Sequence, residues 1–429
     1  MTQPSPAAVR PDAAREPRAA LRERFAQVRA LSQHLCAPLE PEDMVVQSMP
    51  DASPAKWHLA HTSWFFENFI LQPHAPGYRC FDPQFGYLFN SYYETVGSFH
   101  PRPERGLLSR PTVTQVLDYR AHVTHALDAL AADCDAATWQ RIAPLVDLGC
   151  HHEQQHQELL LMDIKHLFSR NPLKPAYHAH HPPPGTAAPL GYHGFPEGLQ
   201  RIGHDGAGFA FDNESPRHRV FVAGFELADR LVTEGEYLEF MRDGGYRTPQ
   251  LWLSDGWATV QAEGWQAPAY WQQEDGAWQV FTLGGLRPLE PAAPVCHLSL
   301  YEADAYARWA GARLPTEAEW EVAAATQPVA GHFLDAGWFH PAAAPDGAGL
   351  RQLYGDVWEW TGSPYSPYPG YRPPAGAIGE YNGKFMSNQM VLRGGACVTP
   401  PDHVRATYRN FFPPHTRWHF SGLRLARDL

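Results

Sequence analysis

The first part of the chain repeats its apolar residues every three or four positions. Residues at this spacing share one face of an α-helix, so the pattern predicts amphipathic helices rather than strands. The clearest run is Val116, Tyr119, Val123, Leu127 and Leu130. The helices predicted in this way cover about 19–38, 54–72, 112–134 and 138–168. Together they favour an all-α four-helix bundle, in which 73–111 forms an ordered loop.

The pattern changes beyond residue 172. Residues 173–196 are rich in proline and lack apolar periodicity, which is typical of a linker between domains. After it, short apolar runs such as Arg219–Val222 alternate with Gly, Pro, Asn and Asp. Helical spacing returns near 300–312 and 316–325. This mixture predicts an α+β domain over 197–429.

The length of the chain agrees with two folded domains. A chain of 429 residues is longer than one typical core can hold, and 44% of its residues are hydrophobic, which suits a globular protein. The predicted helical domain covers 19–172 and the α+β domain 197–429. Residues 1–18 are rich in Pro, Ala and Arg without apolar periodicity, so we expect a disordered lead.

Charge and cysteine content narrow the function classes. The net charge of -12 disfavours a nucleic-acid partner, because phosphate backbones require basic surfaces. The sequence contains no apolar run of about 18 residues and no apolar signal segment, so we expect neither a membrane span nor export. Its six cysteines are widely spaced and include no CxxC pair, which favours a reducing cytoplasm.

Two histidines stand on the last helix of the predicted bundle. His152 and His156 are about 40° apart around the helix axis, so both imidazoles can bind one ion. Their stripe also carries leucines and therefore faces the bundle interior. Such a pair favours a metal site over two hydrogen-bonded core histidines. Asp163 is our candidate to orient an imidazole, whereas Glu158 lies about 160° from His156 and should not join the same ion.

A third ligand is expected from another helix of the bundle. The segment WHLAH offers His58 and His61. His61 shares an apolar stripe with Trp57 and Trp64, whereas His58 is rotated away from the centre of that stripe. His61 is therefore the better candidate. The alternative is a core histidine packed between the two tryptophans.

The same helix also matches the HExxH pattern of zinc metalloproteases, in which the glutamate after the first histidine is the general base. Such enzymes need a further ligand downstream. The positions that would hold the glycine and histidine of the extended motif are Leu159 and Met162, and no glutamate follows Glu158 until Glu197. The zinc-protease interpretation therefore lacks its third ligand, although spacing alone fits zinc as well as iron.

Several motifs together resemble one enzyme family. In the first domain these are WHLAH, NSYY from Asn90, RGLLSRPT from Arg105 and HxxxHxE from His152; in the second they are RLPTEAEWE, GDVWEW, VLRGGAC and SGLRLA. Their order resembles the ergothioneine-biosynthetic sulfoxide synthases, which include the related selenoneine synthases. The resemblance covers nearly the whole chain after residue 20. It implies a DinB-like bundle followed by a formylglycine-generating-enzyme-like, C-type-lectin-related domain.

The resemblance also implies a reaction. These enzymes use Fe(II) and O2 to join the sulfur of cysteine or γ-glutamylcysteine to imidazole C2 of hercynine, which gives a sulfoxide. The family's iron ligands map onto His61, His152 and His156. A three-histidine site leaves positions open for O2 and substrates.

Further site residues follow from the same resemblance. A tyrosine of the NSYY segment is expected to give a proton or electron to the reacting oxygen, and Tyr93 is favoured over Tyr92, with Tyr381 as the alternative. The expected hercynine-binding residues are Gln155, Asn410, Phe411 and Phe412. Arg102 and Arg105 are candidates for the carboxylate of the sulfur donor, or else solvated surface residues.

Two alternatives remain at this level. Selenoneine synthases join hercynine to a selenosugar and would keep the iron ligands and the hercynine loop. A non-catalytic lectin-like module would have no reason to carry the three histidines. Formylglycine formation is not expected, because Cys296 and Cys397 are far apart in the sequence and match no recognised copper pair.

Overall fold

The computed structural model describes residues 15–429 and divides into two compact units. The first unit holds the described residues up to Ser91 together with Ser98–Gln157. The second holds Tyr92–Gly97 and Glu158–Leu429. The predicted lead, 1–18, lies largely outside the described residues.

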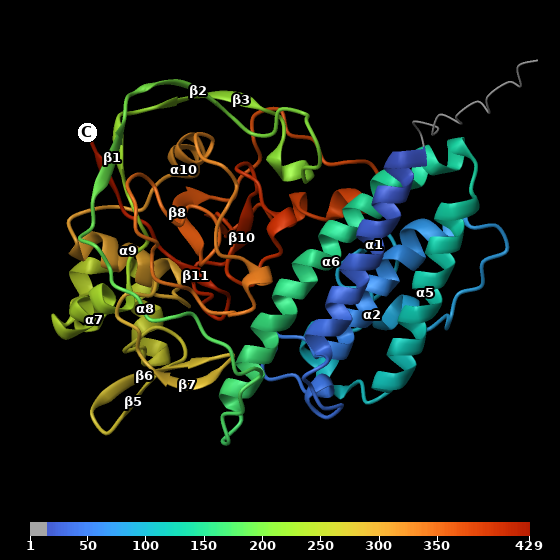
Figure 1. Ribbon diagram of the computed structural model, residues 1–429, viewed down its shortest axis with the longest axis horizontal. Coiled ribbons are helices and arrows are strands. Elements are labelled where there is room, and N and C mark those ends of the chain that lie inside the picture. The colour runs from blue at the N-terminus through green and yellow to red at the C-terminus, as the bar shows by residue number, and fades with distance from the viewer. Residues whose placement is uncertain (1–14) are drawn as a thin grey trace, which may run out of the picture. The chain divides into compact units, whose positions relative to one another are not determined.

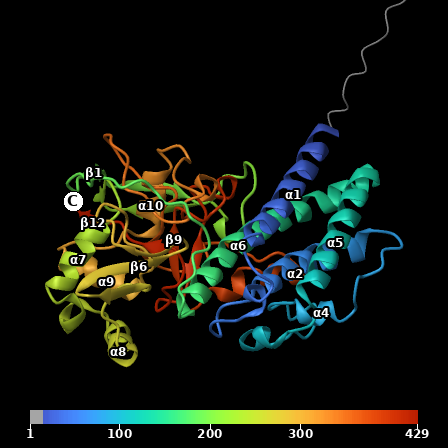
Figure 2. The same cartoon turned by 60° about the horizontal axis from the view of Figure 1, so that its bottom comes forward.

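Long helices build the first unit, as predicted. They are α1 (Arg15–Cys36), α2 (Ala55–Phe66), α5 (Val113–Asp133) and the part of α6 (Ala136–Arg170) up to Gln157. Figure 1 shows α1, α2 and α5 running side by side along α6, and Figure 2 shows the same packing from another direction. Helix α5 begins at a capping box, in which Thr112 and Gln115 satisfy each other's backbone amides. The all-α bundle is confirmed.

The bundle core contains a buried ionic network beside the apolar residues. Glu153 on α6 is fully buried and pairs with Arg29 at 2.9 Å and with Arg120 at short range. Ser32 donates a further hydrogen bond of 2.6 Å to the same carboxylate. The network thus ties α1, α5 and α6 together. A buried charge without such partners would cost several kcal/mol, on the order of 3 to 5.

The connection between α2 and α5 is ordered and contains short helical turns. The π-turn Glu67–Leu71 extends α2 and continues into α3 (Gln72–His74); α4 (Phe85–Leu88) and a 3-10 turn (Arg102–Leu107) follow. Buried Glu67 anchors this connection, since it accepts hydrogen bonds of 2.6 Å from the hydroxyls of Tyr78 and Tyr119.

The second unit combines short strands with short helices, as the sequence predicted. Its helices are α7 (Glu234–Arg242), α8 (Ser254–Glu263), α9 (Leu300–Trp309) and α10 (Glu317–Ala324). Its strands are β1 (Tyr192–Phe195), β2 (Gly198–Ile202), β3 (His218–Val222), β4 (Phe225–Ala228), β5 (Trp271–Glu274), β6 (Ala277–Thr282), β7 (Gly285–Pro288), β8 (Trp358–Pro364), β9 (Met390–Arg393), β10 (Asn410–Phe412), β11 (Ser421–Gly422) and β12 (Ala426–Asp428).

These strands form small, mostly antiparallel sheets. Their orders are β1-β4-β12, β2-β3, β5-β6-β7 and β10-β9-β8-β11. In the last of these, Trp360 pairs with Leu392, and Leu392 pairs with Asn410 on its other side. Helix α10 packs against β8 and β9 and buries Trp320. Residues about 40 and 70 positions beyond α10 are thereby brought beside it, which local periodicity does not predict.

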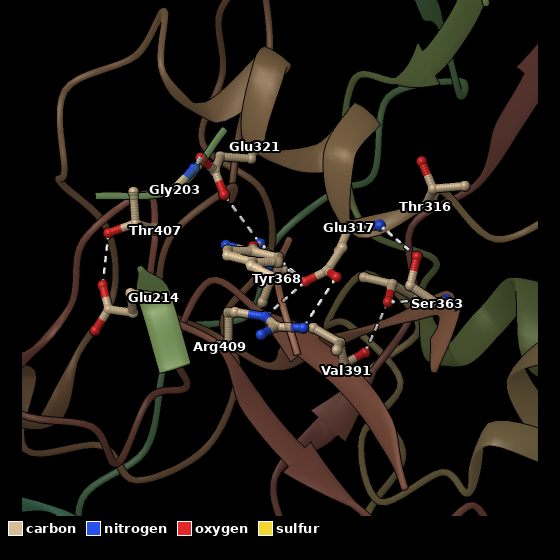
Figure 3. Close-up of polar contacts among 12 residues, drawn as sticks. Gly203, Glu214, Thr316, Glu317, Glu321, Ser363, Tyr368, Val391, Thr407 and Arg409 are labelled. Carbon is tan, nitrogen blue, oxygen red and sulfur yellow. Dashed lines mark hydrogen bonds and ion pairs between the residues drawn. The ribbon is translucent and has the colours of Figure 1, made fainter. Parts of the chain in front are cut away.

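Buried ion pairs cross the core of this unit. Arg409 binds the Glu317 carboxylate at 2.9 Å (Figure 3). Arg393 binds Glu321 at the same distance. Arg424 and Glu359, both fully buried, pair at 2.9 Å. These pairs explain how a domain with little regular structure keeps its loops in place. In the described part of the chain, no helix is both long and apolar enough to span a bilayer.

Candidate metal centre

Three histidines of the first unit meet between α2 and α6. His61 comes from α2, whose residues are all buried, and His152 and His156 come from one face of α6. The nitrogen atoms that these side chains offer lie within 4.8 Å of one another. The structure thus brings together the three residues that the sequence singled out as candidate ligands.

The spacing of these nitrogens fits a metal ion. His61 Nε2 and His152 Nε2 are 3.2 Å apart. Two nitrogens that each lie about 2.1 Å from one ion, at tetrahedral or octahedral angles, are separated by about 3.0 to 3.4 Å. An all-imidazole set suits iron, zinc or copper, so the donors alone do not choose the metal.

Hydrogen bonds turn the correct nitrogen toward this centre. His61 Nδ1 lies 2.6 Å from the carbonyl oxygen of Phe89, which can only accept, so the proton is on Nδ1 and the Nε2 lone pair is available. His156 Nδ1 lies 2.9 Å from His58 Nδ1. Orienting partners of this kind are typical of metal-bound histidines. Asp163 was predicted for the role, but His61 and His156 use Phe89 and His58.

His58 is a neighbour of the site that helical periodicity did not single out. Its rotation away from the centre of the α2 stripe made it the weaker ligand candidate, and in the structure its Nδ1 lies 2.9 Å from His156 Nδ1. The i, i+3 spacing of His58 and His61 in WHLAH was the available signal, since it puts both on adjacent parts of one helix face.

Burial keeps these imidazoles neutral. It lowers the pKa of His152 to about 3, and together with the neighbouring His152 it lowers the pKa of His61 and His156 well below the usual 6.5. Neutral imidazole is the form that binds metal ions, so protons do not compete for the site near pH 7.

Aromatic side chains enclose His61. Its ring stacks on Trp57 with centroids 4.7 Å apart, and on Trp64 with centroids 5.5 Å apart. Arg105 packs on one of these aromatic side chains: its guanidinium lies 3.4 Å from the centroid of a Trp57 ring and donates to Ser53 Oγ at 2.9 Å. Arg105 is therefore a buried support of the site. Arg102 is exposed and donates to the Asp51 carbonyl oxygen.

The carboxylates of the HxxxHxE motif are engaged elsewhere. Glu153 pairs with Arg29 and Arg120 in the bundle core. Glu158 accepts hydrogen bonds of 2.6 Å from Trp358 Nε1 and Thr399 Oγ1 in the second unit. A metalloprotease would need Glu153 as a base facing metal-bound water. A carboxylate held by two arginines does not fit that role.

The predicted tyrosines form a cluster in the second unit. Tyr93 is fully buried, and its ring stacks on Tyr92 with centroids 4.7 Å apart. Burial, followed by the nearby hydroxyls of Tyr92 and Tyr381, raises the Tyr93 pKa well above 10. The three tyrosines that the sequence left as alternatives thus adjoin one another, and each holds its proton at neutral pH.

The remaining predicted substrate residues divide between the units. Gln155 is half-buried on α6, directly before His156. Asn410, Phe411 and Phe412 form strand β10 of the second unit and are half-buried. Phe411 stacks on Tyr365 with centroids 4.0 Å apart. The preceding residue, Arg409, is fixed by the Glu317 ion pair shown in Figure 3.

Comparison with known proteins places both units in recognised families. Residues 24–160 match the DinB superfamily, and residues 195–344 and 337–429 match the sulfatase-modifying factor enzyme 1-like domain. The bundle and the α+β domain of the sequence analysis therefore have the expected fold classes.

Two relatives match this chain over most of their own length, and a third matches about half of this chain. The chain is 34% identical to a hercynine oxygenase of Mycolicibacterium thermoresistibile, over 89% of this chain and 88% of that protein. It is also 34% identical to a hercynine oxygenase of Mycobacterium tuberculosis, over 90% of this chain and 94% of that protein. A formylglycine-generating enzyme of Streptomyces coelicolor is 29% identical, over 52% of this chain and 84% of that protein.

Proposed function

This chain belongs to the hercynine oxygenase family, and we propose that it is an O2-dependent non-heme iron enzyme that forms a carbon–chalcogen bond at imidazole C2 of hercynine. The expected sulfur donor is cysteine or γ-glutamylcysteine. The product is then a hercynyl sulfoxide on the route to ergothioneine.

The observation that carries this proposal is the cluster of His61, His152 and His156. Their nitrogens approach one another as ligands of one ion do. When bound, Fe(II) would activate O2 and favour the thiolate form of the donor. Burial keeps the three histidines neutral, and Phe89 and His58 orient His61 and His156, so these two side chains are preorganised to bind that ion.

The overall reaction balances with one O2. A thiol S–H and the imidazole C2–H are lost, a C–S bond and an S–O bond form, and the second oxygen atom leaves as water with the two hydrogens. The thiol sulfur and C2 are oxidised while O2 is reduced. No further reductant is required, because the sulfur and C2 together supply the four electrons that reduce O2.

The protein would recognise hercynine through complementary groups. Hercynine carries a trimethylammonium, a carboxylate and an imidazole. Phe411 and Phe412 can present ring faces to the cation, and the amides of Asn410 and Gln155 can hydrogen-bond the polar groups. A tyrosine hydroxyl that stays protonated at neutral pH, as Tyr93 does, is suited to donate a proton during turnover.

Selenoneine synthesis is the alternative within the same reaction class. A selenosugar would replace the thiol, and the iron ligands and hercynine residues would keep their roles. The ion pairs of Glu153 speak against the zinc-protease alternative, because that carboxylate cannot also serve as the general base.

Metal analysis combined with oxygen uptake tests the proposal. The purified protein should contain about one iron per chain and consume O2 only when hercynine and a donor are both present. His152→Ala and His156→Ala should lose the iron and the uptake, whereas His125→Ala, an exposed histidine on α5, should keep both. Zinc with peptidase activity would refute the proposal.

A further inference from the structure

A short segment of the second unit is held by a carboxylate and an ammonium group. The segment is Tyr92–Gly97, which contains no regular secondary structure. Glu380 accepts hydrogen bonds of 3.0 Å from the backbone amides of both Glu94 and Thr95, and another from the Thr95 hydroxyl. Lys384 donates to the Tyr92 carbonyl oxygen and, at 3.0 Å, to Glu380. We call these two side chains the Glu380–Lys384 clamp.

The clamp has the chemistry of a strong local anchor. Two successive amides and a hydroxyl converge on one carboxylate, an arrangement that favours the ionised acid. Although desolvation opposes ionisation, the contacts with Thr95, Lys384 and Glu94 hold the Glu380 pKa at about 2. The anchor is therefore intact throughout the neutral pH range. Both side chains are partly exposed, so its strength comes from the number of contacts rather than from burial.

The clamp joins the two segments that carry the candidate catalytic tyrosines. Tyr92 and Tyr93 lie in the held segment, and Tyr381 directly follows Glu380. Lys384 Nζ also lies 5.2 Å from the Tyr92 ring, against which Phe385 packs with centroids 5.1 Å apart. Two partly exposed side chains outside the tyrosine cluster thus contact both segments that carry it.

We propose that Glu380 and Lys384 are positioning residues, which keep the Tyr93 hydroxyl in one place for proton donation. This inference rests on the proposed function. Proton transfer requires the donor within hydrogen-bond reach of its target, and a misplacement of about 1 Å can cost on the order of a hundredfold in rate. In a segment without helix or sheet hydrogen bonds, the clamp supplies the constraint that regular structure supplies elsewhere.

Hydrogen exchange tests the clamp without any activity measurement. Glu380→Ala removes the acceptor of the Thr95 amide and one of the two acceptors of the Glu94 amide, which also donates to the Tyr92 carbonyl oxygen. Exchange in a peptide covering 90–97 should therefore accelerate, by at least about tenfold at Thr95. Glu239→Ala, which removes another exposed glutamate paired with an arginine, should leave that peptide unchanged. Equal exchange in Glu380→Ala and wild type would overturn the clamp.

Kinetics test the positioning role. In Glu380→Ala, kcat for the hercynine-dependent reaction should fall on the order of tenfold to a hundredfold, with iron content and the KM for hercynine unchanged. The solvent deuterium isotope effect on kcat should rise, because proton donation becomes slower than the other steps. Glu380→Gln keeps one acceptor oxygen, so its kcat should lie between those of wild type and Glu380→Ala. Lys384→Met should also lower kcat.

The outcomes separate this inference from the proposed function. If the wild-type protein showed no hercynine-dependent O2 uptake, the proposed function would be refuted and the positioning role with it. The exchange experiment would still test whether Glu380 protects the segment. The wild type could instead be active while Glu380→Ala shows accelerated exchange. If Glu380→Ala then kept the same kcat and isotope effect as Glu239→Ala, the positioning role alone would be overturned.

Discussion

His61 Nε2 and His152 Nε2 lie 3.2 Å apart, although 91 residues separate the two histidines in the chain. His61 Nε2 carries a lone pair, because the His61 proton is on Nδ1. His152 Nε2 either donates a hydrogen bond to it or, in the other tautomer, shares a metal ion with it, and the His156 ligand atom within 4.8 Å of both favours the ion. The contact is therefore the geometric basis for the proposed metal site.

His58 should strengthen metal binding without touching the ion. His58→Phe keeps the ring volume but removes the partner of His156 Nδ1. The loss of such an orienting partner typically weakens metal binding about 10- to 100-fold. Anaerobic competition with an Fe(II) chelator measures the change, with His125→Phe on the exposed face of α5 as the control. Unchanged affinity in His58→Phe would show that the His58 contact does not orient His156.

Glu153 should be essential for the stability of the bundle. Glu153→Ala leaves Arg29 and Arg120 buried without their anion, so the free energy of unfolding should fall by about 3 to 5 kcal/mol. Asp147 lies on the same helix as Glu153 and forms a partly exposed ion pair with Arg24 of α1. Asp147→Ala removes that pair and should cost at most about 1 kcal/mol. Urea denaturation of both variants checks the difference, and equal losses would contradict the role assigned to the network.

Stability should fall with rising pH because of Glu234. Burial raises the pKa of this side chain from the usual 4.5 to about 8. Between these values the folded state binds the proton more tightly than the unfolded chain does, so the free energy of unfolding falls as pH increases. In Glu234→Gln this decrease should be smaller by a few kcal/mol.

Urea denaturation at pH 5 and pH 8 measures the contribution of Glu234, with the exposed Glu263→Gln as control. A decrease that is the same in Glu234→Gln and wild type would show that Glu234 is not protonated in the folded protein.

Tyr93 should be needed for turnover but not for metal binding. Tyr93→Phe removes the hydroxyl and keeps the buried ring, so iron content should stay unchanged while sulfoxide formation falls about 10²- to 10⁴-fold. Tyr92→Phe is the matched comparison. If Tyr93→Phe formed sulfoxide at the wild-type rate, the assignment of the proton donor would be wrong.

Local periodicity was sufficient to predict the helices and the shared face of His152 and His156. Both depend on residues three or four positions apart, where helix geometry alone decides which side chains are neighbours. The choice of His61 over His58 also followed from an apolar stripe. The orienting contact between His58 and His156 did not, because it joins residues of two helices whose relative rotation is set by packing.

Long-range contacts account for most of what the sequence left open. From the sequence alone, Glu153 could have faced either the metal or the bundle core. It faces the core because Arg29 of α1 and Arg120 of α5 pair with it there. In the second unit, Tyr381 adjoins Tyr92 and Tyr93 through a loop that has no periodic signal. Short strands such as β10 likewise depend on partners far away in the chain.

The most direct test of the account is the product formed when O2 is admitted to anaerobic, Fe(II)-loaded protein. Hercynine would be supplied with cysteine, γ-glutamylcysteine or a selenosugar in separate reactions, and the products identified by mass spectrometry. We predict a hercynine adduct that carries the sulfur or selenium of one donor, and none with His152→Ala or without O2. Hercynine recovered unchanged with every donor, from protein that holds one iron per chain, would contradict the account.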